Sequence, residues 1–117
     1  MYLRVPKFLS EEKLKLVDEL IASGQFDDGA ATTGGPTKSV KKNLQIDFGK
    51  HPQKDEFLQM ITTSVNSHPI MRSAALPRRM TYPLLSKYET GMSYGWHIDN
   101  PIMSTMASPV RTDIACT

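Results

Sequence analysis

Residues 88–100 read YETGMSYGWHIDN, a segment in which His97 and Asp99 stand two positions apart. On a β-strand, such residues project from the same face and lie ~6.6 Å apart along the chain. Both side chains can therefore lean onto one metal ion. A neutral imidazole with a carboxylate suits Fe(II), and a site with two histidines and one carboxylate leaves coordination positions open. The pair is the candidate metal site, and Ile98 is expected to point the other way into apolar packing.

A bare His-x-Asp triplet also arises by chance, as a surface histidine beside an aspartate. The preceding residues narrow the interpretation, because Tyr88, Gly91 and Tyr94 stand at fixed distances from His97. The segment resembles the Tyr-x2-Gly-x2-Tyr-x2-His-x-Asp signature of prolyl-hydroxylase-like oxygenases. Four other segments are similar, in order and spacing, to the bacterial PKHD-type hydroxylases: Thr32–Gly34, Lys41–Gln45, Ala74–Pro77 and Arg111–Asp113. The resemblance covers essentially the whole chain and matches the N-terminal half of that family.

The resemblance implies an α+β fold, namely the N-terminal part of a double-stranded β-helix (jelly roll) with two flanking helices and an incomplete sheet. We expect a single domain over residues 1–117, with helices and strands over about 1–79 and the start of the jelly-roll core over about 80–117. In the family, a second histidine far downstream completes the iron site, and a basic residue beyond it binds the distal carboxylate of 2-oxoglutarate. Neither has a counterpart before Thr117, so the chain is expected to be a fragment that lacks the third ligand.

The activity implied by the resemblance is hydroxylation by an Fe(II)- and 2-oxoglutarate-dependent dioxygenase, with release of succinate and CO2. His97 and Asp99 match the first two iron ligands, and Tyr88 matches a tyrosine that lines the 2-oxoglutarate pocket. The small-molecule partners are 2-oxoglutarate and O2, and L-ascorbate keeps the iron reduced in such enzymes. Asp99 favours hydroxylation over halogenation, because halogenating relatives lack this carboxylate. The resemblance leaves the primary substrate open between a protein side chain and a small molecule.

Two further polar residues are candidates for a substrate pocket. Asn43 and Gln45 alternate on one expected strand face, and a solvated face is the alternative interpretation. The other two histidines are assigned structural roles. His51 lies in a turn before a proline, and His68 ends an expected helix, where a cation is favourable.

The sequence predicts helices over about 11–23 and 54–67. Ser10 is a suitable N-cap for the first helix. The apolar face of that helix is expected to consist of Leu14, Val17, Leu20 and Ile21. Strands are expected over about 3–9, 43–48, 80–88, 94–99 and 110–117, with a loop over 24–39. Alternation along the 94–99 strand places Trp96 opposite His97, where it is expected to pack.

The composition is that of an ordinary globular domain, with 39% hydrophobic residues, 22% charged residues and a net charge of +2. The basic residues are scattered, so no nucleic-acid partner is expected, and no stretch approaches the ~20 apolar residues of a membrane span. A single cysteine fits a reducing, cytoplasmic setting. A homodimer of the complete protein is compatible with the sequence.

Two alternatives to the hydroxylase stay open, namely a non-catalytic remnant or binding module of the same fold, and different metal chemistry such as a cupin-like isomerase.

Overall fold

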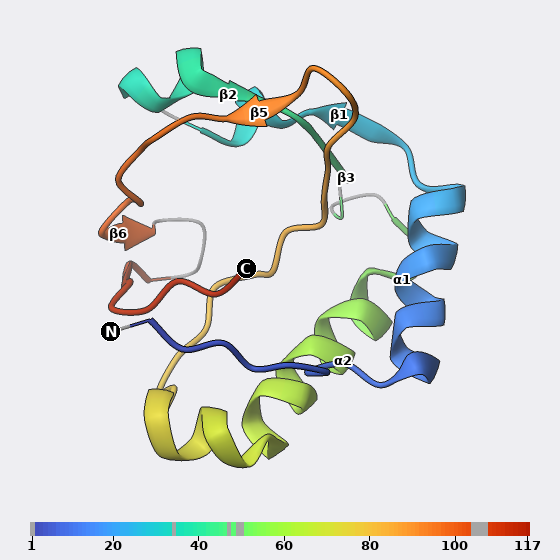
Figure 1. The fold of residues 1–117 in the computed structure, drawn as a ribbon, viewed down its shortest axis with the longest axis vertical. Coiled ribbons are helices and arrows are strands. Elements are labelled where there is room, and N and C mark those ends of the chain that lie inside the picture. The colour runs from blue at the N-terminus through green and yellow to red at the C-terminus, as the bar shows by residue number, and fades with distance from the viewer. Residues whose placement is uncertain (1, 34, 47, 49–50, 104–107) are drawn as a thin grey trace.

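The computed structural model describes residues 2–33, 35–46, 48, 51–103 and 108–117 (Figure 1). Within these ranges the chain forms two α-helices, α1 (Glu11–Ser23) and α2 (Lys54–Ser67), which the sequence predicted at these positions. Two 3-10 segments, η1 (Gly29–Thr32) and η2 (Gly35–Val40), precede the central strands, and a π-helical segment, η3 (Met71–Ala75), follows α2. No helix in the described ranges combines the length and apolarity needed to cross a bilayer.

The strands form three small antiparallel sheets, so the fold is mixed α+β. One sheet has the order β1 (Phe26–Asp28), β3 (Leu44–Ile46) and β4 (Ser86–Lys87). A second pairs β2 (Lys41–Lys42) with β5 (Ser93–Tyr94), and a third pairs β6 (Ile102–Met103) with β7 (Val110–Arg111). In Figure 1, α1 and α2 lie on one side of the molecule, and β1 follows the end of α1.

Several strand predictions are wrong in extent. Residues 3–9, all described, form no strand, and the expected loop at 24–39 contains β1. Of the strand expected over 80–88 only β4 forms, and the one expected over 94–99 ends at Tyr94. Strands of two or three residues hold few hydrogen bonds of their own, so their boundaries are set by partners distant in sequence rather than by local pattern.

The first helix is capped as expected, but only part of its predicted apolar face is buried. The Ser10 side chain accepts a hydrogen bond from the backbone N–H of Lys13 at 3.4 Å, which satisfies one of the free donors at the helix start. Leu20 is fully buried, whereas Leu14 and Ile21 are 45% and 39% exposed. The side chains of α1 that reach the core are Leu16, Val17 and Leu20.

The two helices and the three-stranded sheet share one core. Its buried residues are Leu20, Ile46, Phe48 and Phe57. The rings of Phe48 and Phe57 stack with their centroids 4.6 Å apart and their planes 9° from parallel. Aromatic pairs of this kind contribute beyond the area that they bury. The stack therefore fixes α2 against the end of β3.

The segment 41–46 exchanges one partner strand for another at Asn43. Lys42 pairs with Ser93 of β5, and Leu44 pairs with Lys87 of β4. Residues 86–87 and 93–94 thus pair antiparallel with the two halves of this segment, and the backbone between them turns away from it. This register places β5, which leads into His97, beside β2.

A guanidinium ties together two segments that flank the metal pair in sequence. Arg79 donates to the backbone oxygens of Ser108 and Pro109, each at 3.3 Å, and to the Ser108 hydroxyl at 2.8 Å. These contacts connect positions 29 and 30 residues apart. The stretch that carries His97 and Asp99 is therefore held at both of its ends.

Candidate metal centre

The structure brings the two predicted ligands together. The Nε2 atom of His97 lies 3.3 Å from Oδ1 of Asp99, and the two side chains are 23% and 65% exposed. The contact forms although residues 95–99 are not a strand. The two side chains are in contact, and their role as metal ligands stays a prediction, whereas the strand geometry expected at 95–99 is wrong.

The protonation of the imidazole follows from its other contact. Nδ1 of His97 lies 2.7 Å from the backbone oxygen of Gly95. A carbonyl oxygen only accepts hydrogen bonds, so Nδ1 carries the proton, and Nε2 of the neutral ring presents a lone pair. That lone pair faces a carboxylate oxygen of Asp99, which is also an acceptor. A metal ion placed between these two acceptors would bind both of them.

The donor set and its spacing fit a divalent metal. Two donors bound at ~2.1 Å and at right angles to each other lie about 3.0 Å apart, close to the observed 3.3 Å. A metal-binding imidazole usually donates its other N–H to a carboxylate, a backbone carbonyl or a water, as His97 does to Gly95. Among the described residues, no group of three or more His, Cys, Asp or Glu side chains could hold a metal ion. The described residues thus offer two protein ligands at this site.

The imidazole of His97 stacks on Tyr94, which in turn contacts Lys41. The Tyr94 ring stacks on His97 with centroids 3.6 Å apart and planes 11° from parallel. The Nζ atom of Lys41 lies over the Tyr94 ring, 5.3 Å from its centroid. Lys41 pairs with Tyr94 in the sheet, so the strand register builds this stack. The orientation of His97 is therefore coupled to the β2–β5 pairing.

Two packing predictions around the pair are wrong. Trp96 and Ile98, which flank His97, are 103% and 89% exposed. The sequence argument assumed a strand with one face against a core, and the chain here leaves the sheet after Tyr94. The two apolar side chains consequently find no cover among the described residues.

The remaining predicted site residues gather on the neighbouring strand. Asn43 and Gln45 are 3% and 5% exposed, which excludes the alternative of a solvated face. The Nδ2 atom of Asn43 donates to the Tyr88 hydroxyl at 2.9 Å, and Nε2 of Gln45 donates to the Ser86 hydroxyl at 3.0 Å. Tyr88 itself is 49% exposed. The structure brings Asn43 and Tyr88 into contact, and their roles toward substrate or co-substrate stay predictions.

The histidines outside the pair have structural surroundings. His68 ends α2, and its backbone N–H donates to Ser64 O. Its ring lies against Phe8 with the centroids 5.4 Å apart. In His51, Nδ1 accepts a hydrogen bond from the backbone N–H of Gln53 at 3.2 Å. Neither ring approaches the metal pair in any contact of the described residues.

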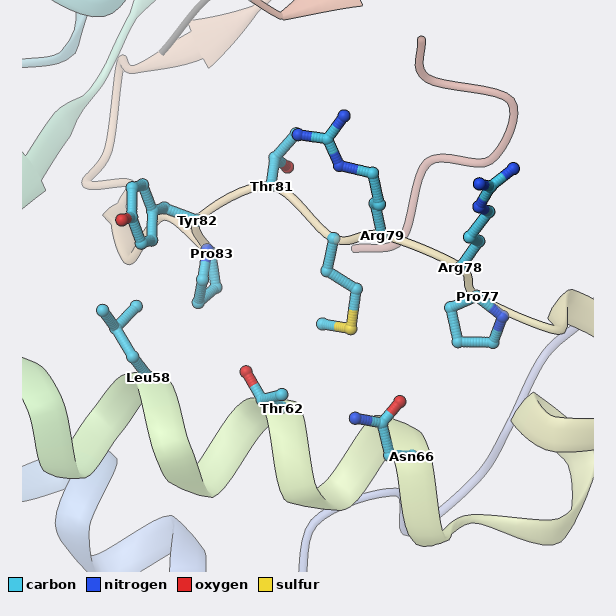
Figure 2. A pocket seen from close by; sticks show the side chains of 10 residues that line it. Leu58, Thr62, Asn66, Pro77, Arg78, Arg79, Thr81, Tyr82 and Pro83 are labelled. Atoms are coloured by element: carbon cyan, nitrogen blue, oxygen red, sulfur yellow. The ribbon is translucent and has the colours of Figure 1, made fainter. Parts of the chain in front are cut away.

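A cavity of about 380 Å³ lies elsewhere, between α2 and residues 77–83 (Figure 2). Leu58, Thr62 and Asn66 project into it from α2, and the facing wall includes Tyr82 and Pro83. None of the candidate site residues lines this cavity. The cavity and the metal pair are therefore separate features.

Sequence reasoning missed three contributors to the site. The Gly95 carbonyl and the Tyr94 ring lie inside the quoted motif, but nothing in their spacing showed that they contact His97. Lys41 could have been found, because it stands two positions before Asn43 and so shares its strand face. Side-chain stacking across strands requires the register, which local patterns do not reveal.

The buried lysine of this stack gives a pH-dependent prediction. Burial lowers the pKa of Lys41 from 10.5, and the negative charge of Asp28 opposes this effect. Between the folded pKa and 10.5 the unfolded chain binds more protons, so the free energy of unfolding rises with pH across that window. In urea titrations from about pH 8 to about pH 10.5, we expect the wild type to gain stability relative to Lys41→Met as the pH rises. A constant or shrinking difference would contradict this assignment.

The fold and the paired ligands define a mixed α+β protein with a two-residue candidate metal site. No family model matches the chain. Three of the curated proteins that it matches are each named PKHD-type hydroxylase. The relative from Methylobacillus flagellatus is 34% identical over 119 residues, which cover 100% of this chain and 67% of the relative. The chain belongs to the PKHD-type hydroxylase family.

The other two relatives are longer than the matched region. The protein from Aliarcobacter butzleri is 36% identical over 118 residues, covering 99% of this chain and 52% of the relative. The protein from Hyphomonas neptunium is 34% identical over 119 residues, covering 100% of this chain and 52% of the relative. The chain spans about half the length of these two relatives.

Proposed function

We propose that this chain supplies the first two iron ligands of an Fe(II)- and 2-oxoglutarate-dependent hydroxylase with a jelly-roll core. The observation that carries the proposal is the 3.3 Å approach of His97 Nε2 to Asp99 Oδ1, close to the separation of two ligands of one divalent ion. Membership of the PKHD-type hydroxylase family supports the same assignment. Iron bound there would supply O2 activation coupled to decarboxylation of 2-oxoglutarate, with succinate, CO2 and a hydroxylated product as the result.

The residues of the chain would divide the work as follows. His97 and Asp99 hold the metal, and the Gly95 carbonyl keeps the proton on the far nitrogen of the imidazole. The Tyr94 ring fixes the plane of His97. The 2-oxoglutarate site includes Tyr88. A third ligand and a basic anchor for 2-oxoglutarate are expected from the family pattern further along the sequence of its members.

Asn43 and Gln45 are proposed to line the substrate pocket. Both are buried polar side chains on one strand face, and each contacts a hydroxyl on the segment 86–88. A reducing, cytoplasmic setting and L-ascorbate belong to the same proposal, because the metal must stay ferrous between turnovers.

The assay for the proposal uses a polypeptide of family length. The chain is joined to the portion of the Aliarcobacter butzleri relative that lies outside the matched segment. With Fe(II), O2 and 2-oxoglutarate we expect release of succinate, and His97→Ala should reduce it to background. His68→Ala, at the end of α2, serves as a control that should retain release. A folded, iron-loaded protein that releases no succinate with a range of candidate substrates would contradict the proposal.

One observation favours a second candidate, a non-catalytic metal-binding module. The described residues provide two ligands and no third. This alternative predicts metal binding without consumption of 2-oxoglutarate in the family-length protein, so the same assay separates the two candidates.

A further inference from the structure

Three polar side chains form a buried row on one face of residues 41–45. Lys41, Asn43 and Gln45 are 8%, 3% and 5% exposed, while the intervening Lys42 is exposed. The row faces the segment that leads into His97, because its members contact Tyr94, Tyr88 and Ser86 respectively. Since alternate strand residues are ~6.6 Å apart, the Tyr88 contact lies one step along this face from the stack that holds His97.

The middle member of the row controls the hydrogen bonding of Tyr88. Asn43 Nδ2 donates to the phenol oxygen at 2.9 Å across 45 residues of sequence. The phenol oxygen thereby accepts a hydrogen bond from the amide, and its own O–H remains available to donate one. The Tyr88 side chain is 49% exposed, so a ligand in solution can reach it.

Gly29 packs directly against Asn43. The backbone N–H of Gly29 donates to the backbone carbonyl of Asn43 at 2.9 Å, which holds the two chain segments together. A Cβ atom at Gly29 would collide with Asn43 Oδ1, so this position needs glycine for the amide to stay in place. Oδ1 is itself buried and finds no hydrogen-bond partner in the described part of the chain, which costs stability. The polar side chain is therefore poorly explained as a stabilising residue.

We infer that Asn43 is a positioning residue that fixes the Tyr88 hydroxyl as a hydrogen-bond donor toward a carboxylate of the acidic co-substrate. The inference rests on the proposed function, because it refines how that site takes its dicarboxylate. A carboxylate oxygen only accepts hydrogen bonds. The Tyr88 oxygen already accepts one from the Asn43 amide, so its O–H is available to donate to the carboxylate. Asn43 acts through Tyr88 and needs no contact with the ligand.

The test measures carboxylate binding without the metal. Glutarate has both carboxylates of 2-oxoglutarate and no keto group, so its binding does not depend on iron. It is titrated into the metal-free family-length protein, and the chemical shifts of the backbone amides of residues 86–88 give the dissociation constant. We expect Tyr88→Phe to weaken binding about tenfold or more, and Asn43→Leu to weaken it several-fold. In the double variant, Asn43→Leu should add no further loss, because its effect passes through the hydroxyl.

Stability measurements separate positioning from a structural role. Tyr88→Phe leaves the buried Asn43 amide without its partner, so it should lower the urea midpoint. Asn43→Leu, an apolar side chain of similar size, should leave the midpoint unchanged or raise it. The double variant should recover stability but not affinity. If Asn43→Leu fails to fold, N43D keeps the shape while removing the donor, and it should weaken glutarate binding. Ser64→Ala removes a buried hydrogen bond to Lys13 far from this row and should leave glutarate affinity unchanged.

The outcomes distinguish this inference from the proposed function. The inference is overturned if the metal-free family-length protein does not bind glutarate, or if its Asn43→Leu variant binds glutarate as tightly as the wild type. It stands if the expected pattern appears even though the family-length protein releases no succinate, which would defeat only the hydroxylase assignment. Succinate release with an unaltered KM for 2-oxoglutarate in Asn43→Leu would leave the hydroxylase assignment intact and defeat the inference.

Discussion

Alanine at either position of the metal pair is expected to lower the affinity of the chain for Mn(II), an air-stable substitute for Fe(II), by at least about tenfold. The reason is that His97 Nε2 and Asp99 Oδ1 are the two donors that the described chain offers, 3.3 Å apart. Removing one halves the protein ligands. The chain has a single tryptophan, Trp96, which is fully exposed beside His97. Quenching of its fluorescence by the paramagnetic ion therefore gives a local measure of binding.

The control for this experiment is His68, a histidine outside the metal pair. His68→Ala should bind Mn(II) like the wild type, because His68 lies at the end of α2 beside Phe8. Free Mn(II) measured by electron paramagnetic resonance checks the fluorescence result independently. Equal affinity of the wild type and the double variant His97→Ala/Asp99→Ala would show that the pair is only a surface contact, of the kind that contributes little energy.

The largest effect on stability is expected from Leu20→Ala in α1. Leu20 is fully buried in the core with Ile46, Phe48 and Phe57. Truncating such a leucine costs about 2–5 kcal/mol through lost burial and the cavity left behind. Domains of ordinary stability have only about 5–15 kcal/mol in total. Urea denaturation followed by circular dichroism should show a large drop in the midpoint.

Leu14→Ala provides the matched comparison, since it is the same substitution in the same helix. Leu14 is 45% exposed, so we expect a change within about 0.5 kcal/mol. Comparable losses for Leu14→Ala and Leu20→Ala would mean that the helix buries the face predicted from the sequence rather than the one observed.

The helices could be predicted because their signals are local. Ser10 caps α1 through a contact three residues away, and α2 spans the residues predicted for it. The strands could not be predicted to the same degree. β4 and β5 each contain two residues, and both exist because residues 41–46 lie alongside them. Such pairing depends on contacts about 40 to 50 residues apart in the chain.

The candidate site, too, was only partly predictable from the sequence. The pair at positions 97 and 99 was visible in the sequence, because a motif of fixed spacing surrounds it. The hydrogen bond from Asn43 to Tyr88 was not, since nothing in either segment indicates the register that joins them. The exposure of Trp96 was also unforeseen, because alternation predicts a face only while the strand continues.

The three hydrogen bonds of Arg79 turn the intervening polypeptide into a loop whose two ends share one anchor. Closing a loop has an entropic cost that grows slowly with length, by about 0.6 kcal/mol for each doubling. Insertions in this loop outside residues 88–99, whose spacing carries the motif, should therefore cost little stability. Arg79 thus makes the free energy of unfolding nearly independent of the length of the segment that it encloses.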